Sequence, residues 1–159
     1  MSNDTKPRIT RQNLPQRFLK GRELLMAHFR PILNHFELSD QQWRILRLLD
    51  EYLCLEPRDL CNLCQIHSAS MVGMLARMEE RGLIRRSPIP TDQRRVAVQL
   101  APQGDKLVSE IAPLIDQQYR HLEEALGTDV FKNLSNALEA FIAKQDTPVP
   151  RVQLPFHRQ

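Results

Sequence analysis

The spacing of the apolar residues changes twice along the chain, and this change restricts the fold more than any other feature. Up to residue 82 the apolar residues follow helical spacing, most clearly in the segment 67–82. Residues 83–87 and 95–100 then alternate between apolar and polar, which is typical of two short strands. Helical spacing resumes at Pro102. The sequence therefore predicts a mainly α protein with one two-stranded β element.

Local signals indicate where the helices on either side of this β element begin and end. Ser39 and Gln42 have the spacing of a capping box, and Gly82 suits the residue that follows a helix. Thr128 is expected to cap the last helix, whose apolar side chains are expected to point inward. Pro31 is expected to bend the first helix. The expected helices cover about 14–36, 40–53, 57–64, 67–82, 102–126 and a segment from 128 onward.

Positive charge is concentrated in the middle of the chain. The 159 residues, of which 42% are hydrophobic, suffice for one domain, and the formal net charge is only +3. Residues 81–95, however, hold five arginines and one aspartate, which gives +4. Such a basic patch indicates contact with a polyanion. Residues 1–13 are expected to form a flexible N-terminal arm, and residues 146–159 a proline-rich C-terminal tail.

The chain carries no sign of export or of insertion into a membrane. No apolar run approaches the roughly 18 residues of a membrane span. The polar N-terminus also lacks the apolar segment of a secretory signal. We therefore expect a cytoplasmic protein with no membrane partner, whose three cysteines are thiols.

Residues 56–82 contain two short helices joined by a few residues, which is the shape of a helix-turn-helix. In that motif the second helix enters the major groove of DNA, and its early residues contact base edges. An ordinary helical hairpin has the same spacing, so this segment alone leaves both interpretations open. The candidate DNA contacts are the outward residues of the second helix, Ser68, Ser70, Val72, Gly73 and Arg77.

The loop expected between the two strands, PIPTDQRR, holds the densest positive charge. An arginine at the tip of such a hairpin can reach into the minor groove of DNA, where negative potential is concentrated. Asp92 is expected to brace the loop by bonding to its backbone or to Arg94. A solvated basic loop without a DNA contact is the alternative. The candidate contacts in this region are Arg86, Asp92, Arg94 and Arg95.

The segment LARMEERGLIRRSPIPTDQRRVAVQLAPQG resembles the wing region of the MarR family of winged helix-turn-helix repressors. The family pattern consists of Asp-x-Arg, an alternating strand and then Leu-Thr-x-x-Gly. It appears here as Asp92, Arg94, Leu100 and Gly104. Ala101 stands where the family usually has a capping threonine, so the start of the following helix is expected to be weaker.

This resemblance implies a MarR-like domain over residues 14–145. Its DNA-binding lobe, a winged helix-turn-helix, would cover residues 39–100. An all-helical dimerisation platform would be built from residues 14–36 and 102–145. The resemblance further implies a homodimer that binds double-stranded DNA at a near-palindromic operator, with Arg94 in the minor groove.

Three segments, RELLMAHFRPIL, LSDQQWRILRLL and GMLARMEERGLI, are similar to the branch of this family that represses genes of aromatic-acid catabolism. Regulators of the homoprotocatechuate and nicotinate pathways are examples of this branch. The similarity implies that a small aromatic carboxylic acid releases the repressor from its operator. Relatives hold such ligands between the dimerisation platform and the DNA-binding lobe.

Arg22 interrupts the apolar stripe of the first helix, and a cation in that place needs a partner. The partner is either a carboxylate of the protein or the carboxylate of a ligand, which a guanidinium binds well through paired hydrogen bonds. The rest of the candidate effector site consists of two further cations and four apolar or aromatic side chains, namely Arg44, Arg47, Met26, Phe29, Trp43 and Met71.

Cys61 and Cys64, with His67, allow a redox or a zinc interpretation. Two thiols one helical turn apart would constrain little if bridged, and each is more simply a small core residue. Redox sensing through these cysteines or Cys54 is kept as an alternative function, and no metal or cofactor is expected.

The sequence shows no phosphate loop, nucleophile elbow or paired catalytic carboxylates, so we expect no enzyme. A helical interaction module without DNA binding is the remaining alternative.

Overall fold

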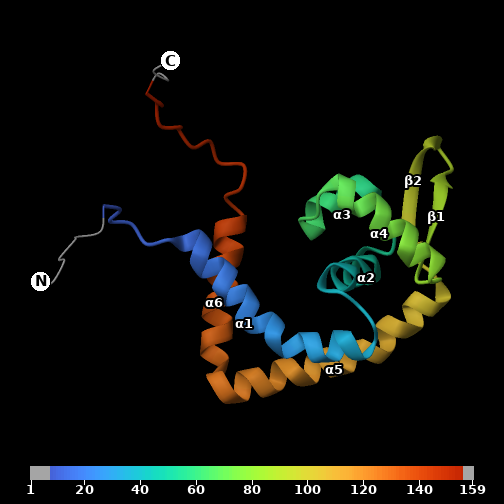
Figure 1. Cartoon of the computed structure of the whole chain (residues 1–159), viewed down its shortest axis with the longest axis horizontal. Coiled ribbons are helices and arrows are strands. Elements are labelled where there is room, and N and C mark those ends of the chain that lie inside the picture. The colour runs from blue at the N-terminus through green and yellow to red at the C-terminus, as the bar shows by residue number, and fades with distance from the viewer. Residues whose placement is uncertain (1–7, 156–159) are drawn as a thin grey trace, which may run out of the picture. The chain divides into compact units, whose positions relative to one another are not determined.

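The computed structural model of the chain describes residues 8–155, whose path is shown in Figure 1. These residues form helices and one antiparallel hairpin, which confirms the expected mainly α fold with a two-stranded wing. The chain divides into two compact units, one ending at Gln118 and one beginning at Tyr119. In chain order the elements are α1 (Leu14–His35), α2 (Asp40–Tyr52), α3 (Pro57–Cys64), α4 (Ser68–Glu80), β1 (Ile84–Ile89), β2 (Asp92–Leu100), α5 (Pro102–Leu126) and α6 (Thr128–Ile142).

The first two helices begin at polar side chains that satisfy free backbone N–H groups. The side chain of Asn13 accepts a hydrogen bond from the backbone nitrogen of Gln16 at 3.1 Å. At α2 the expected capping box is confirmed. The backbone nitrogen of Gln42 donates to Oγ of Ser39 at 3.2 Å, and that of Ser39 donates to Oε1 of Gln42 at 2.9 Å. The helical hydrogen bonding of α1 continues past Pro31 to His35.

Gly82 ends α4 as the sequence predicts. Its φ of 70° lies in the left-handed region, which glycine adopts without steric cost. The backbone nitrogen of Gly82 then donates to the carbonyl of Glu79 at 2.9 Å, and that of Leu83 donates to the carbonyl of Met78 at 2.9 Å. This turn directs the chain from α4 straight into β1, so the hairpin follows the helix without an intervening loop.

An aliphatic core in the first unit joins the helices to the base of the hairpin. Leu55, in the loop before α3, exchanges two backbone hydrogen bonds with Val98 of β2, at 3.1 and 2.8 Å. At the start of α5, a Cβ on Gly104 would lie 1.9 Å from the carbonyl oxygen of Leu83, so the two backbones approach closely. The largest fully buried side chains are Leu33, Ile45, Leu46, Leu49, Leu60, Met71, Leu75, Met78, Leu83, Ile84, Val98 and Ile111.

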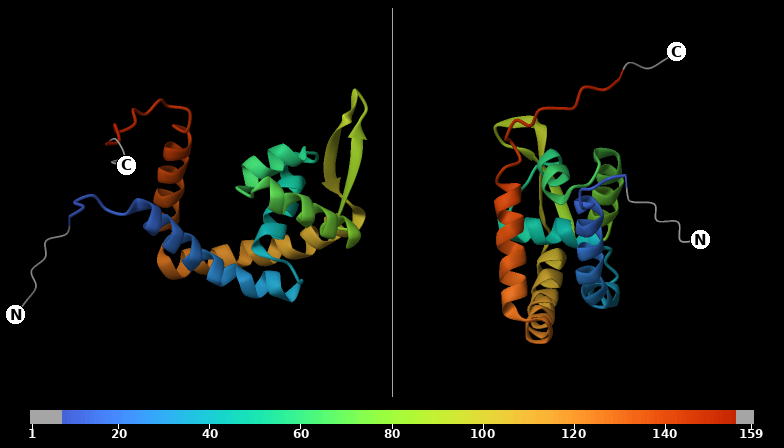
Figure 2. Two further views of the ribbon diagram at one scale, coloured as in Figure 1. Left: turned by 45° about the horizontal axis from the view of Figure 1, so that its top comes forward. Right: turned by 90° about the vertical axis from the view of Figure 1, so that its left-hand side faces the viewer.

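The strands of the wing are longer than the sequence pattern predicts. The pattern predicted strands only over residues 83–87 and 95–100, but just Pro90 and Thr91 form the turn between them, so the predicted length of the loop was wrong. Pro88 pairs with Val96, and its missing N–H is tolerated because each strand of a two-stranded sheet has a free edge. Figure 2 shows the hairpin extending past α3 and α4.

In the second unit, two expectations for the last helix were wrong. Thr128 is the first residue of α6 and not its cap, because the capping position is taken by Gly127 with a φ of 95° and no side-chain hydrogen bond. The apolar residues of α6 also do not point into a core, since none is buried and Ile142 is 59% exposed. The apolar side of this amphipathic helix therefore stays at the surface of the single chain.

No helix within residues 8–155 is long and apolar enough to cross a membrane.

Candidate nucleic-acid interface and effector pocket

A tight turn fixes α3 and α4 against each other. Gln65 adopts a left-handed conformation with φ of 52°, and the backbone nitrogen of Ile66 donates to the carbonyl of Cys61 at 3.1 Å. The buried side chain of Ile66 anchors the turn. Arg44 of α2 donates from its guanidinium to the carbonyl of Cys64, the last residue of α3. Two short helices held in this way form the helix-turn-helix that the sequence left as one of two interpretations.

The outward side of α4 begins with small side chains. Ser68 and Ser70 are exposed in its first turn, and Val72 is 67% exposed. Gly73 is half-buried, and a Cβ there would lie 3.3 Å from Nη1 of Arg77. The guanidinium of Arg77 thus lies over Gly73. The outward side of α4 thus consists of small side chains, several of them polar, and one cation. Side chains of this kind can approach base edges in a major groove.

Two of the predicted wing cations are already paired with carboxylates. Nη2 of Arg86 lies 2.6 Å from Oε2 of Glu79, and Arg95 forms an ion pair with Glu56. The hydrogen bond from the Arg86 side chain holds the pKa of Glu79 below its usual value, with a further contribution from the Arg86 backbone. The Arg95 side chain lowers the pKa of Glu56 in the same way. Sequence reasoning missed both glutamates.

Arg94 differs from these two neighbours. Among the described residues its exposed side chain has no ion-pair partner. Oδ1 of Asp92 accepts a hydrogen bond from the backbone nitrogen of Arg94 at 3.1 Å, which is one of the two bracing contacts expected of this aspartate. Both residues lie in β2 beside the turn at Pro90 and Thr91. The structure therefore presents Arg94 near the end of the wing, on a strand and not in a loop.

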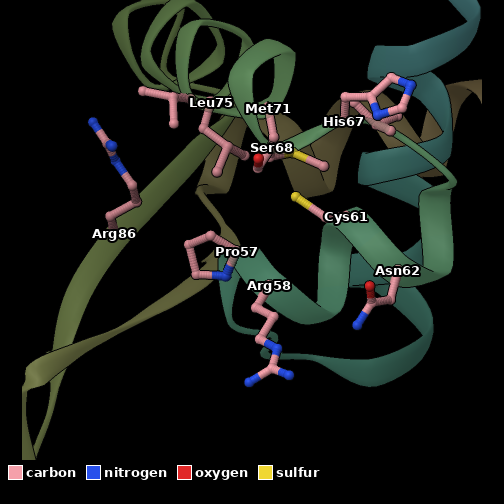
Figure 3. Close-up of a pocket in the computed structure, with 11 residues that line it drawn as sticks. Pro57, Arg58, Cys61, Asn62, His67, Ser68, Met71, Leu75 and Arg86 are labelled. Carbon is pink, nitrogen blue, oxygen red and sulfur yellow. The ribbon is translucent and has the colours of Figure 1, made fainter. Parts of the chain in front are cut away.

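A pocket of about 520 Å³ lies between α3, α4 and β1 (Figure 3). Cys61 and Met71 face the space between the two helices, and Arg86 borders it from β1. Met71 was expected in the wall of an effector site together with Arg22. The structure instead places Met71 in this pocket, which adjoins the outward side of α4 near Ser68.

Ionised side chains gather around Arg22. Its guanidinium contacts Glu23 at 2.9 Å and Asp40 at 3.6 Å, and the side chain is 43% exposed. Arg30 contacts the same two carboxylates, at 2.7 and 3.3 Å. Arg22 therefore has protein carboxylates as partners, which was the first of the two possibilities that the sequence left open.

Three arginines nevertheless line one pocket of about 470 Å³. Arg22 and Arg44, both predicted, are joined there by Arg30. Sequence reasoning missed Arg30, although it follows Glu23 by seven residues, or two helical turns, which places the pair on one side of α1. The pocket also has polar groups that can bond to an anion or a hydroxyl. The remaining residues of its lining are Asn34, Leu38, Ser39, Asp40 and Gln41.

The other predicted effector residues do not line this pocket. Phe29 and Trp43 are buried in the core of the first unit. Met26 is half-buried and Arg47 is exposed. In the single chain, the cationic part and the aromatic part of the expected effector site are therefore not brought together in one cavity.

The three cysteines are free thiols in different environments. Cys54 is exposed, Cys61 is half-buried and Cys64 is buried. Burial raises the pKa of Cys64 to about 11, which disfavours its reactive thiolate. In the part of the chain that the structure describes, no three metal-binding side chains are grouped together.

Comparison with known proteins agrees with this geometry. The sequence model of the MarR family matches residues 38–96, from the start of α2 into the wing. The chain is 41% identical over 128 residues to the HTH-type transcriptional regulator FarR of Neisseria gonorrhoeae, which covers 80% of this chain and 88% of FarR. It is 36% identical over 125 residues to the homoprotocatechuate degradative operon repressor of Escherichia coli, covering 79% of this chain and 84% of that repressor.

A solved structure extends the likeness from sequence to fold. The crystal structure of NadR in complex with 4-hydroxyphenylacetate matches with a TM-score of 0.78 and 39% sequence identity. The match covers 89% of this chain and 99% of that one. The two relatives matched by sequence are, by their names, a transcriptional regulator and an operon repressor, and not enzymes.

Proposed function

The chain belongs to the MarR family of transcriptional regulators, and from this premise we propose that it is a cytoplasmic, homodimeric repressor that binds a near-palindromic operator. The observation that carries the proposal is the joint exposure of the outward side of α4 and of Arg94 on the adjacent wing, which has no ion-pair partner among residues 8–155. α4 enters the major groove with Ser68, Ser70 and Arg77, while Arg94 reaches the minor groove.

The test of this DNA-binding role uses Arg94→Ala. The substitution is expected to weaken operator binding and to make its salt dependence shallower, because a cation that faces phosphate is lost. The fold is expected to survive, since the exposed side chain supports no core. Arg120→Ala, which removes another exposed arginine from α5, is the matched control. Unchanged operator affinity of Arg94→Ala at matched salt, measured by fluorescence anisotropy, would refute the role.

We further propose that a small hydroxylated aromatic or heteroaromatic acid releases the repressor from DNA. Support comes from two relatives, the homoprotocatechuate degradative operon repressor and NadR in complex with 4-hydroxyphenylacetate. The acid's carboxylate pairs with Arg22, helped by Arg44 or Arg47, and its ring lies near Trp43, which is buried in the single chain and must become accessible for this contact. To bind there, the acid must displace Glu23 or Asp40 from Arg22, so one carboxylate replaces another. Release also requires that the acid binds the DNA-free form more tightly than the DNA-bound form.

Calorimetry with a panel of such acids tests the effector proposal. Arg22→Ala is expected to lose most of the affinity, whereas Lys20→Ala, which removes an exposed cation of the same helix, is expected to keep it. Full affinity in Arg22→Ala would mean that the arginine serves only its protein carboxylates. If no aromatic acid binds the wild type, the effector proposal fails and the DNA-binding proposal is unaffected.

A further inference from the structure

Glu79, in the last turn of α4, holds β1 through both of its carboxylate oxygens. Oε1 accepts a hydrogen bond from the backbone nitrogen of Arg86 at 3.0 Å. Oε2 accepts from Nε and Nη2 of the same arginine at 2.9 and 2.6 Å. An acidic residue in the last turn of a helix opposes the helix dipole, so the stability of α4 itself does not explain the glutamate there. Its contacts tie the helix that faces DNA to the first strand of the wing.

Glu56 does the same for the second strand. It occupies the capping position of α3, yet its side chain makes no capping hydrogen bond. Its carboxylate instead accepts from Nε of Arg95 at 3.2 Å and from Nη2 of the same arginine. Glu79 in α4 and Glu56 directly before α3 thus each contribute one carboxylate to one strand of the wing.

These two pairs decide which wing cations are available to DNA. Arg86 and Arg95 are held by carboxylates, and Nε of Arg85 donates to Oε1 of Gln99 at 3.2 Å. Among the described wing arginines, Arg94 alone has no side-chain partner recorded in the structure. The charges of two wing arginines, Arg86 and Arg95, are therefore compensated by carboxylates of the protein, whereas Arg85 is bonded only to a neutral amide.

We propose that Glu79 and Glu56 are positioning and specificity-determining residues that withhold Arg86 and Arg95 from phosphate and present Arg94 to the operator. The inference rests on the proposed DNA-binding function. It also revises the expectation that Arg86 and Arg95 contact DNA themselves. Attraction between cations and phosphates is independent of sequence, so withholding two cations per subunit lowers binding to random DNA. Fixing the wing to α4 favours the one arrangement that fits the operator.

The experiment compares Glu79→Gln and Glu56→Gln with wild type on two duplexes of roughly three helical turns. One duplex has random sequence and the other comes from the DNA upstream of the protein's own gene. Affinities are measured between about 50 and 200 mM salt. Each variant is expected to bind random DNA more tightly, with a slope of log affinity against log salt steeper by about one per freed arginine. The ratio of upstream to random affinity is expected to fall.

Two further variants isolate the cause. Glu80→Gln removes the same charge from the next residue of α4, which is exposed and has no ion-pair partner among the described residues. It is expected to keep the wild-type slope. Adding Arg86→Gln to Glu79→Gln is expected to restore the wild-type slope, because the freed cation is gone.

An unchanged salt slope in both glutamine variants, with only a lower Tm, would overturn the inference and leave the two pairs a purely structural role. A wild type that shows no salt-dependent binding to either duplex is a different result. It would refute the proposed DNA-binding function itself, and this inference with it.

Discussion

Gly104 shows how a single residue can be indispensable to this fold. Gly104→Ala would place a methyl group 1.9 Å from the carbonyl oxygen of Leu83, and backbone cannot move aside as a flexible side chain can. The substitution is expected to lower the free energy of unfolding by at least about 1–3 kcal/mol. Gly21→Ala is the control, because nothing lies within 4 Å of that position in α1. It is expected to raise stability by up to about 1 kcal/mol. Denaturant unfolding of both variants measures the difference, and equal stabilities would contradict the steric argument.

Residue types and their roles could be predicted from the sequence only where the partner lies close by. The bond from Arg94 to Asp92 spans two residues, and the sequence predicted it as one of two bracing contacts. The pairing of Arg95 with Glu56 spans 39 residues, and no local pattern signals it. Arg22 was noticed because it interrupts an apolar stripe, but its second carboxylate, Asp40, comes from the next helix. Long-range ion pairs of this kind depend on the packing of elements, which one sequence does not display.

At the scale of elements, the start of α2 and the end of α4 were predicted correctly from local chemistry, whereas the cap expected at Thr128 was wrong. The capping box at Ser39 joins residues three positions apart, and the turn at Gly82 joins residues no more than five positions apart. The wing was predicted too short because its prolines were interpreted as a turn, whereas the free edge of a two-stranded sheet accepts Pro88. The inward direction expected for α6 failed because helical periodicity identifies an apolar side but not what covers it.

The pairs between helix and strand predict how stability depends on pH. Because the pKa of Glu79 is lowered from 4.5 in the folded protein, its stabilising contribution is fully present above that pH. The contribution is lost as the pH falls through the lowered pKa. Glu79→Gln is therefore expected to be less stable than wild type at neutral pH, and the two are expected to converge in acid. Urea unfolding at several pH values checks this, with Glu80→Gln as the control. A stability gap that persists unchanged below the lowered pKa would contradict the ion-pair origin.

At the scale of the whole molecule, the exposed apolar side of α6 suits the proposed homodimer. Leu134 is 44% and Ile142 59% exposed in the single chain, so covering what remains exposed is worth roughly half of the about 1.5–3 kcal/mol that full burial of such a side chain contributes. The double variant Leu134→Asp/Ile142→Asp is expected to shift the protein from dimer to monomer in analytical ultracentrifugation. Val152→Asp, which changes a still more exposed apolar residue beyond α6, is expected to leave the dimer intact. A double variant that stays dimeric would place the dimer contact elsewhere.

The symmetry of that dimer sets the form of the operator. Two copies of α4 related by a two-fold axis read the same bases on opposite strands, so the site must be nearly palindromic. Each α4 can enter a major groove on one face of the DNA only if the half-sites lie about one turn apart, roughly 10 bp.

Inserting half a turn, about 5 bp, between the half-sites is expected to abolish tight binding, because the second α4 would then face the opposite side of the duplex. Inserting a full turn, in contrast, keeps both half-sites on one face of the DNA but moves them further apart. If the dimerisation platform fixes the distance between the two DNA-binding lobes, this insertion is expected to recover little of the lost affinity. A DNase footprint that covers a single asymmetric half-site, with affinity indifferent to both insertions, would contradict a symmetric dimer as the DNA-binding species.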